Sequence, residues 1–372
     1  MDFPKYIIFD TNCFIEAMRK SDDPHFDYER IKRDAKENGS LIVISAYTLY
    51  ELIQGIDNYI EIEVFKDQLI RFGDFFVTDN HVLDHKGLEY GIDFLFILNL
   101  QDLSDIQKYY SIREEIKNKV YDSLFRRMFT YSSLVAASYV VLSECNADGN
   151  LNYDTFYKCN YILNHFWNKH LDRYSKLFNM RYEHVGQILS FDPKSNVIYK
   201  DYKASSYLRD YILNLIIEIL SIANLELEIA KGEIDYNPNT YDSLIIDRIN
   251  SLTGTISHKS FKKVHSKAVK LSNGKHNITS ICNAILSGYP DDLTKGGYLF
   301  LIDRLFTSGG FGKSFNNDFI DFANMNLLDA FDKGKAVYLT CEKTWMCFLE
   351  TKISNVNVSN SIEFRNMYQL KE

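Results

Sequence analysis

The sequence predicts an α/β fold in which both ends of the chain contribute strands to one parallel sheet. Three short apolar runs indicate the strands: residues 5–9, Leu41–Ser45 and 336–340. Continuous apolar runs of this length are typical of strands that are buried on both faces, as in parallel sheets. Segments with helical periodicity separate the runs, and parallel neighbours require such crossover connections.

The helices that connect these strands are expected at both chain ends. One should begin near Cys13, a second should cover residues 25–37, and a third should start directly after Ser45. A further helix is expected over 316–331, because apolar residues recur there at helical spacing. These residues are Phe319, Phe322, Met325 and Leu328.

The middle of the chain has a different character, since it is rich in Tyr, Phe, Leu and Ile at 3.6-residue spacing. The longest helical stretches are expected over 105–145, 154–179 and 207–231. We therefore expect residues 1–80 and 300–372 to form a domain around the parallel sheet, flanked by helices. Residues 81–299 should form a large, mainly α-helical insertion.

Composition places broad limits on the class of protein. The 372 residues are 46% hydrophobic and 15% aromatic, which indicates a folded chain with a sizeable core. The start of the chain shows no export signal, and the six cysteines include no CxxC pair, so we expect a cytoplasmic protein with reduced thiols. Glu218 and Glu226 interrupt the most apolar helix, which argues against a membrane span.

Carboxylates follow the predicted strands. Asp10 ends the first strand, Glu51 lies in the helix after the second, and Glu342 lies just after the third. Asp318 and Asp321 are spaced i, i+3, so they share one face of the helix that precedes the third strand. Because the carboxyl ends of parallel strands meet at one edge of a sheet, all five carboxylates can converge there.

Converging carboxylates repel each other and are costly to hold together without a cation. Hard oxygen ligands suit Mg²⁺ or Mn²⁺, so the set predicts a metal centre. Taken singly, each residue has a plainer interpretation. Asp10 and Asp318 are suited to cap helices, Asp321 to stabilise a first helical turn, and Glu51 and Glu342 to be exposed helix charges.

Four stretches of the sequence resemble the PIN-domain nucleases, in the order found in that family: IIFDTNCFI, ISAYTLYELIQG, NNDFIDFANMNLL and VYLTCEKTW. The resemblance implies a PIN-like sheet and a metal site of Asp10, Glu51, Asp318 and Glu342. Asp321 would be either a fifth carboxylate or the true third one, and Thr11 or Asn12 would support the site. Two features depart from the family: Glu342 stands where Asp is commoner, and the helical segment before Asp318 is unusually long.

One part of the insertion is strongly basic. No Asp or Glu occurs from Arg248 to Pro290, although the whole chain has a formal net charge of −8. The stretch is either a solvated helix face or a surface that contacts phosphates. Its basic residues are Arg248, Lys259, Lys262, Lys263, Lys267, Lys270 and Lys275.

These features predict a metal-dependent endoribonuclease that uses Mg²⁺ or Mn²⁺, with single-stranded DNA as a second candidate substrate. By resemblance, it would be a prokaryotic toxin or defence effector with a protein regulator or antitoxin. The alternative is a non-catalytic RNA-binding or scaffold module with a PIN-like fold.

Three other patterns carry less weight. The glycine-rich run over 308–314 lacks P-loop spacing and is interpreted as a hinge. His81 and His85 lack further metal ligands. Asn12 stands where an aspartyl phosphatase needs a second acid.

Overall fold

The computed structural model divides the chain into two compact units. It describes residues 3–19, 28–53, 56, 59–72, 76–78, 82–83, 89–90, 95–96, 106–145, 152–165, 204–287, 293–308, 315–326, 328, 335–340 and 358–359. The sheet unit comprises Met1–Leu124, Asp292–Gly296 and Ile320–Glu372. The helical unit comprises Phe125–Asp291 and Gly297–Phe319.

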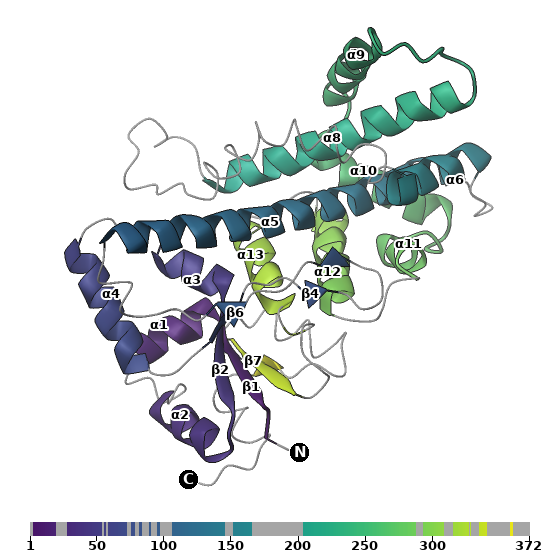
Figure 1. The fold of residues 1–372 in the computed structure, drawn as a ribbon. Helices are drawn as coiled ribbons and strands as arrows, with labels where there is room; N and C mark the ends of the chain where they lie inside the picture. Colours follow the sequence, from purple (N-terminus) through teal and green to yellow (C-terminus); the bar gives the residue numbers. More distant parts are fainter. Residues whose placement is uncertain are drawn as a thin grey trace. The chain divides into compact units, whose positions relative to one another are not determined.

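A parallel sheet formed by both chain ends lies at the centre of the sheet unit (Figure 1). β1 (Tyr6–Phe9) pairs in parallel with β2 (Leu41–Ser45) on one side and with β7 (Ala336–Leu339) on the other. Ile7, Ile8 and Phe9 are fully buried, as expected for a central strand. The predicted α/β class is therefore confirmed.

Shorter strands extend this sheet to the order β6-β3-β2-β1-β7-β8. β3 (Phe76–Thr78) is parallel to β2, and β8 (Val358–Ser359) is parallel to β7. β6 (Leu95–Phe96) pairs with β3 in the antiparallel direction. β4 (Val82–Leu83) and β5 (Glu89–Tyr90) form a separate antiparallel pair.

Four helices of the sheet unit follow its first strands. They are α1 (Thr11–Arg19), α2 (Tyr28–Glu37), α3 (Ala46–Ile53) and α4 (Tyr59–Phe72). α2 buries Tyr28 against Phe9 of β1, with ring centroids 5.9 Å apart. The chain then turns into β2 at Gly39, whose φ of +66° is in the left-handed region that favours glycine.

The rest of the described chain is helical. Its elements are α5 (Ile106–Ser143), α6 (Tyr153–Asn160), the short π-helical η2 (Tyr161–His165), α8 (Ala204–Ala230), α9 (Tyr241–Thr253), α10 (His258–Leu271), α11 (Ile278–Ile285), α12 (Leu293–Ser308) and α13 (Phe315–Met325). α5 and α8 confirm the helices expected over 105–145 and 207–231. Of the helix expected over 154–179, the part beyond His165 lies outside the described residues.

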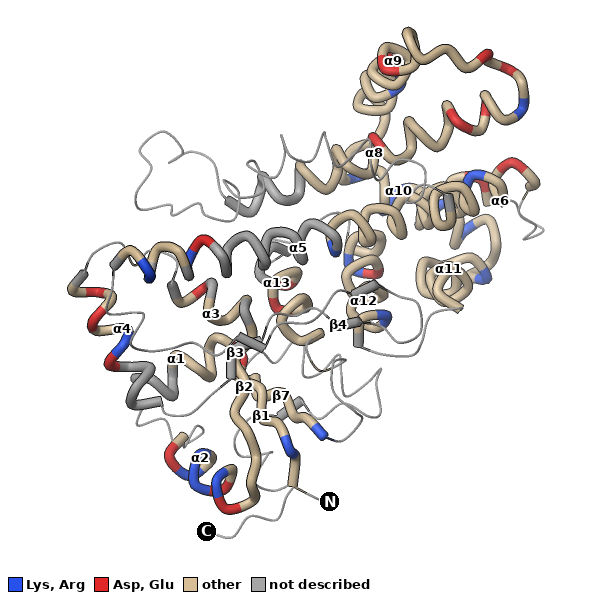
Figure 2. The backbone as a smooth tube through the Cα atoms, in the orientation of Figure 1, with Lys and Arg blue, Asp and Glu red and all other residues tan. Residues whose placement is uncertain are grey.

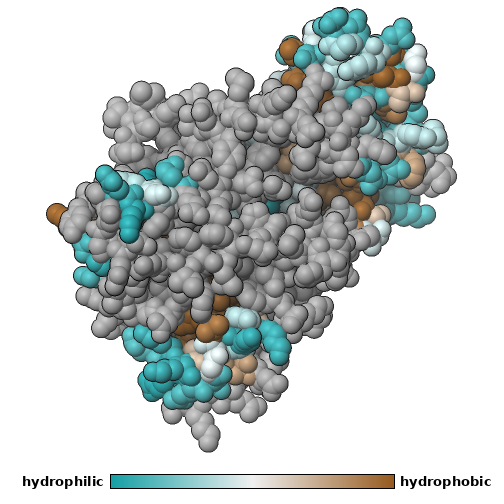
Figure 3. Space-filling view, viewed as in Figure 1, coloured by the Kyte–Doolittle hydropathy of each residue, from teal (hydrophilic) through white to brown (hydrophobic). Residues whose placement is uncertain are grey.

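A group of aromatic side chains lies in the otherwise mainly aliphatic core of the helical unit. Phe261 of α10 packs edge-on against Tyr139 of α5 and Phe306 of α12, with centroids 5.7 and 5.4 Å away. Hydrophilic side chains gather on the outer surface over α9 (Figure 3). No helix in the described part of the chain is long and apolar enough to cross a membrane.

Candidate functional site

Asp10 is the residue that follows β1, and its carboxylate is held by several donors. It is only 3% exposed. Oδ1 accepts hydrogen bonds from the Thr11 amide at 2.7 Å and the Tyr338 hydroxyl at 3.3 Å. Oδ2 accepts one from the Thr340 hydroxyl at 2.9 Å. Asp10 also occupies the N-cap position of α1, because its carbonyl accepts a hydrogen bond from the Phe14 amide. The hydrogen bonds from Tyr338 and Thr340 are additional and are not explained by helix capping.

Glu51 lies beside Asp10 and is linked to it through Thr11. The Thr11 hydroxyl donates to Oε2 of Glu51, while the Thr11 amide donates to Asp10. The pKa of Glu51 is raised from its ordinary value of 4.5 to about 7. Burial is the largest cause and the charge of Asp10 adds to it, while the Thr11 hydrogen bond acts in the opposite direction. The two carboxylates are therefore close enough to repel each other.

Asp321 joins the same group of charges. The Tyr338 hydroxyl is buried, which raises the pKa of Tyr338 well above its ordinary value, and nearby negative groups raise it further. Asp10 and Asp321 are the strongest of these groups, followed by Cys13 and then Glu51. Asp10 thus contacts the Tyr338 hydroxyl directly, while Glu51 and Asp321, two more of the predicted carboxylates, act on it through their charge.

A buried network of uncharged groups connects α13 to the corner between β2 and α3. Ser45 ends β2 and caps α3, since its hydroxyl accepts from the Thr48 amide at 3.0 Å. The Ser45 hydroxyl donates to Oδ1 of Asn324, and Nδ2 of Asn324 donates to Oγ1 of Thr48 at 3.1 Å. Thr48 Oγ1 in turn lies 3.3 Å from the Thr11 hydroxyl oxygen, so the network reaches Glu51 and Asp10.

Asp318 has a different environment from Asp321. Its Oδ2 accepts from Nη1 of Arg304 at 2.6 Å, within the helical unit. The Arg304 guanidinium also lies over the Phe300 ring, 5.3 Å from its centroid. The two carboxylates that the sequence left as alternatives therefore differ: Asp318 forms an ion pair, and Asp321 lies in the acidic group around Tyr338.

Several predicted residues fall outside the described part of the chain. These are Glu342, His81, His85 and the run over 309–314. Among the described residues, no three His, Cys, Asp or Glu side chains form a group that could hold a metal ion. The described donors nevertheless fit a hard cation in kind, because they are carboxylate oxygens; burial raises the pKa of Glu51, and the charge of Asp10 adds to this effect.

Most of the predicted basic residues lie on α10, where they are exposed. Figure 2 colours Lys and Arg blue along the backbone. Phe261 and Ala268 bury the opposite face of the helix. The lysines of α10 form no ion pair with any residue that the structure describes. They are Lys259, Lys262, Lys263, Lys267 and Lys270, and Lys275 is exposed just after the helix.

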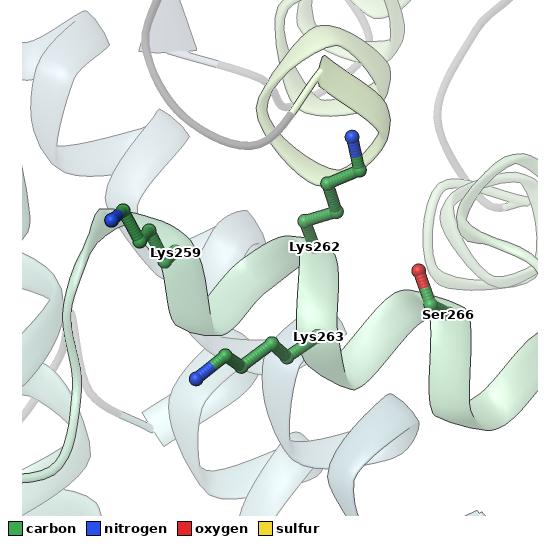
Figure 4. Close-up of a pocket in the computed structure, with 4 residues that line it drawn as sticks. All are labelled: Lys259, Lys262, Lys263 and Ser266. Atoms are coloured by element: carbon green, nitrogen blue, oxygen red, sulfur yellow. The ribbon is translucent and has the colours of Figure 1, made fainter.

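A cavity of about 510 Å³ is lined by Lys259, Lys262, Lys263 and Ser266. Lys259 and Lys263 project in one direction from α10, while Lys262 and Ser266 project in another (Figure 4). Arg248 differs from this set, because both its terminal nitrogens donate to the Glu228 carboxylate of α8.

Sequence reasoning did not single out Tyr338, Thr340, Ser45, Thr48 or Asn324. Thr340 follows β7 as Asp10 follows β1. The expected parallel pairing of these two strands could have indicated that Thr340 lies next to Asp10. Tyr338 is one residue of an apolar run and carries no such signal.

Comparison with known protein families, characterised proteins and solved structures finds no match. The function of the site is therefore inferred from its own residues.

Proposed function

We propose that the sheet unit is the catalytic domain of a metal-dependent nuclease with a PIN-like fold. The observation that carries this proposal is the buried Asp10 carboxylate at the carboxyl edge of a parallel sheet, which is hydrogen-bonded to Tyr338 and Thr340 and linked to Glu51 through Thr11. The charge of Asp321 also acts on the Tyr338 hydroxyl. Protein folds seldom collect buried carboxylates unless a cation or a proton compensates the charge. The edge of the sheet where strands end is also the usual ligand site of such folds.

The proposed cation is Mg²⁺ or Mn²⁺, held by Asp10, Glu51 and Asp321, with Asp318 and Glu342 as further candidates. When bound, such an ion activates water and stabilises charge on a phosphodiester. The chain's own residues orient the ligands: Thr340 and Tyr338 hold Asp10, and Thr11 holds Glu51. In the metal-free protein the pKa of Glu51 is about 7, so its carboxylate can exchange a proton near neutral pH.

RNA is the proposed substrate, with single-stranded DNA as the second candidate. The support is the exposed lysine face of α10, since ammonium groups that pair with no described acidic residue can neutralise phosphates. By resemblance to PIN-like toxins and defence effectors, the protein would act in the cytoplasm under a protein regulator such as an antitoxin.

The second candidate function is a non-catalytic RNA-binding or scaffold module. Two observations favour it. Asp318 is already paired with Arg304, and within the described ranges the carboxylates do not form a group with ligand geometry.

Cleavage of a labelled RNA and a DNA of the same sequence distinguishes the two. We expect cleavage with Mg²⁺ or Mn²⁺, none with a chelator, and none by Asp10→Asn at any metal concentration. Asp67→Asn is the matched control, because Asp67 is an exposed carboxylate of α4 in the same unit. Wild-type rates in Asp10→Asn would refute the assignment of the site. Binding of RNA by the wild type without any metal-dependent cleavage would favour the module.

A further inference from the structure

Asn324 is a buried amide that connects the helix carrying Asp321 to the corner carrying Glu51. It is 1% exposed, and its amide group uses both ends: Oδ1 accepts from Ser45 and Nδ2 donates to Thr48. Both partners are fully buried. Since a buried amide that loses a partner is destabilising, this pair of hydrogen bonds restricts where α13 can lie against β2 and α3.

Asp321 lies three residues before Asn324 on α13, so the two side chains share one face of the helix. Glu51 lies three residues after Thr48 on α3, which gives the same spacing on the partner helix. Asn324 and Thr48, which this hydrogen bond joins, are thus each one helical turn from a carboxylate: Asp321 on α13 and Glu51 on α3. Any shift of α13 along or around its axis moves Asp321 relative to Glu51 and Asp10.

We infer that Asn324 is a positioning residue: through Ser45 and Thr48 it sets the placement of Asp321 beside Asp10 and Glu51. This inference rests on the proposed function, in which the three carboxylates hold a divalent cation. Residues that orient metal ligands from behind typically contribute about 10- to 100-fold to metal affinity. A network that only stabilises the core would affect unfolding and leave metal affinity unchanged.

The test is a Mn²⁺ titration of the full chain. Binding is measured by calorimetry and by the electron paramagnetic resonance signal of the free ion. The variants are Asn324→Ala, Asp321→Asn and the combination of both. Asn326→Ala is the matched control, because Asn326 is a buried amide of the same segment at 2% exposure, two residues further on. Thermal unfolding in chelator measures the purely structural effect of each change.

We expect Asn324→Ala to weaken Mn²⁺ binding about 10- to 100-fold, and Asn326→Ala to leave it within about twofold. In the Asp321→Asn background, removing Asn324 should have little further effect, because the ligand that it positions is gone. Thr48→Val removes the acceptor of the Asn324 amide and should reproduce part of the loss, which keeps the inference testable if Asn324→Ala fails to fold.

Three results would overturn the inference while leaving the metal centre in place. These are wild-type Mn²⁺ affinity in Asn324→Ala, an equal loss in Asn326→Ala, or the same loss with and without Asp321. Absence of Mn²⁺ binding by the wild-type protein would overturn the metal centre and this inference together.

Discussion

Thr340 donates its hydroxyl to Oδ2 of Asp10 over 2.9 Å, and each of the two residues directly follows a strand. The register of β1 against β7 pairs Phe9 with Leu339, so Asp10 and Thr340 leave the sheet next to each other. The Asp10 amide donates to the Leu339 carbonyl at 2.9 Å, which continues the ladder one residue beyond β1. The orientation of the Asp10 carboxylate is therefore fixed by the sheet itself.

Thr340→Val should destabilise the protein by about 1–3 kcal/mol, because it removes a donor from a buried carboxylate without changing the volume of the side chain. Tyr338→Phe should have a smaller effect, since its hydrogen bond to Asp10 is longer at 3.3 Å. Urea denaturation in chelator measures both values. A Thr340→Val protein as stable as the wild type would mean that the Thr340 hydroxyl does not support Asp10.

Glu51 should make the stability of the metal-free protein fall as pH rises. Its pKa is raised from 4.5 to about 7 in the folded state, so between these values the folded protein binds more protons than the unfolded chain. The stabilising contribution is fully present below pH 4.5 and is lost as pH rises through 7. The shift corresponds to about 3 kcal/mol.

Glu51→Gln keeps the shape of the side chain and cannot ionise. In chelator we expect it to match the wild type at pH 4 and to be more stable at pH 8. Denaturation curves at a series of pH values provide the measurement. Parallel profiles for the two proteins would show that the environment of Glu51 does not resist its charge.

Mn²⁺ should raise the melting temperature of the wild-type protein, since an ion that binds only the folded state stabilises it by mass action. At a hundredfold excess over Kd the gain is about 2.7 kcal/mol. Asp321→Asn should reduce the shift more than Asp318→Asn, because Asp318 is already paired with Arg304. The double variant should show the smallest shift. An unreduced shift in the double variant would place the ion elsewhere.

Reversing charge on α10 should weaken RNA binding and reduce its salt dependence. For single strands, the slope of log K against log salt is about −0.7 per neutralised phosphate. We expect the triple variant Lys262→Glu, Lys263→Glu, Lys267→Glu to lose affinity and flatten this slope. Binding is measured across a salt series in the Asp10→Asn background. Cleavage at saturating substrate should survive in the active background, because these residues supply binding that the ground and transition states share.

The matched control for this experiment makes the same change of charge on the sheet unit, in the segments that precede β1 and β2. Lys5, Arg33 and Lys36 are exposed there, and changing all three to Glu should leave the slope unaltered. Arg248→Ala should also leave it unaltered, because Arg248 is occupied by Glu228. A slope that changes equally in all variants would indicate net charge alone as the cause.

Much of the sheet was predictable, because burial on both faces leaves a clear pattern in a short strand. β1, β2 and β7 lie where continuous apolar runs predict strands, and Asp10 follows β1 as expected. The choice between Asp318 and Asp321 could not be made in this way. Both lie on one face of α13, and what separates them is Arg304 on another helix, a contact that depends on tertiary packing.

The same limit applies to Asn324 and Arg248. An asparagine inside an amphipathic helix resembles any polar residue until its partners, Ser45 and Thr48, are known. Arg248 belongs by sequence to the acid-free stretch, but Glu228 reaches it from α8. The lysines of α10 were easier to predict, since helical periodicity alone separates their exposed face from Phe261 and Ala268.

The pairing of β1 with β7 has a consequence for the order in which the protein is made. β1 leaves the ribosome long before its neighbour β7 does. Contacts between such distant segments form slowly, since a long loop must close before they contribute. Tyr338 and Thr340 reach Asp10 only at that stage, so a nascent chain has the Asp10 carboxylate long before it has the groups that orient it. The acidic site is therefore fully oriented only after β7 has been made and has paired with β1.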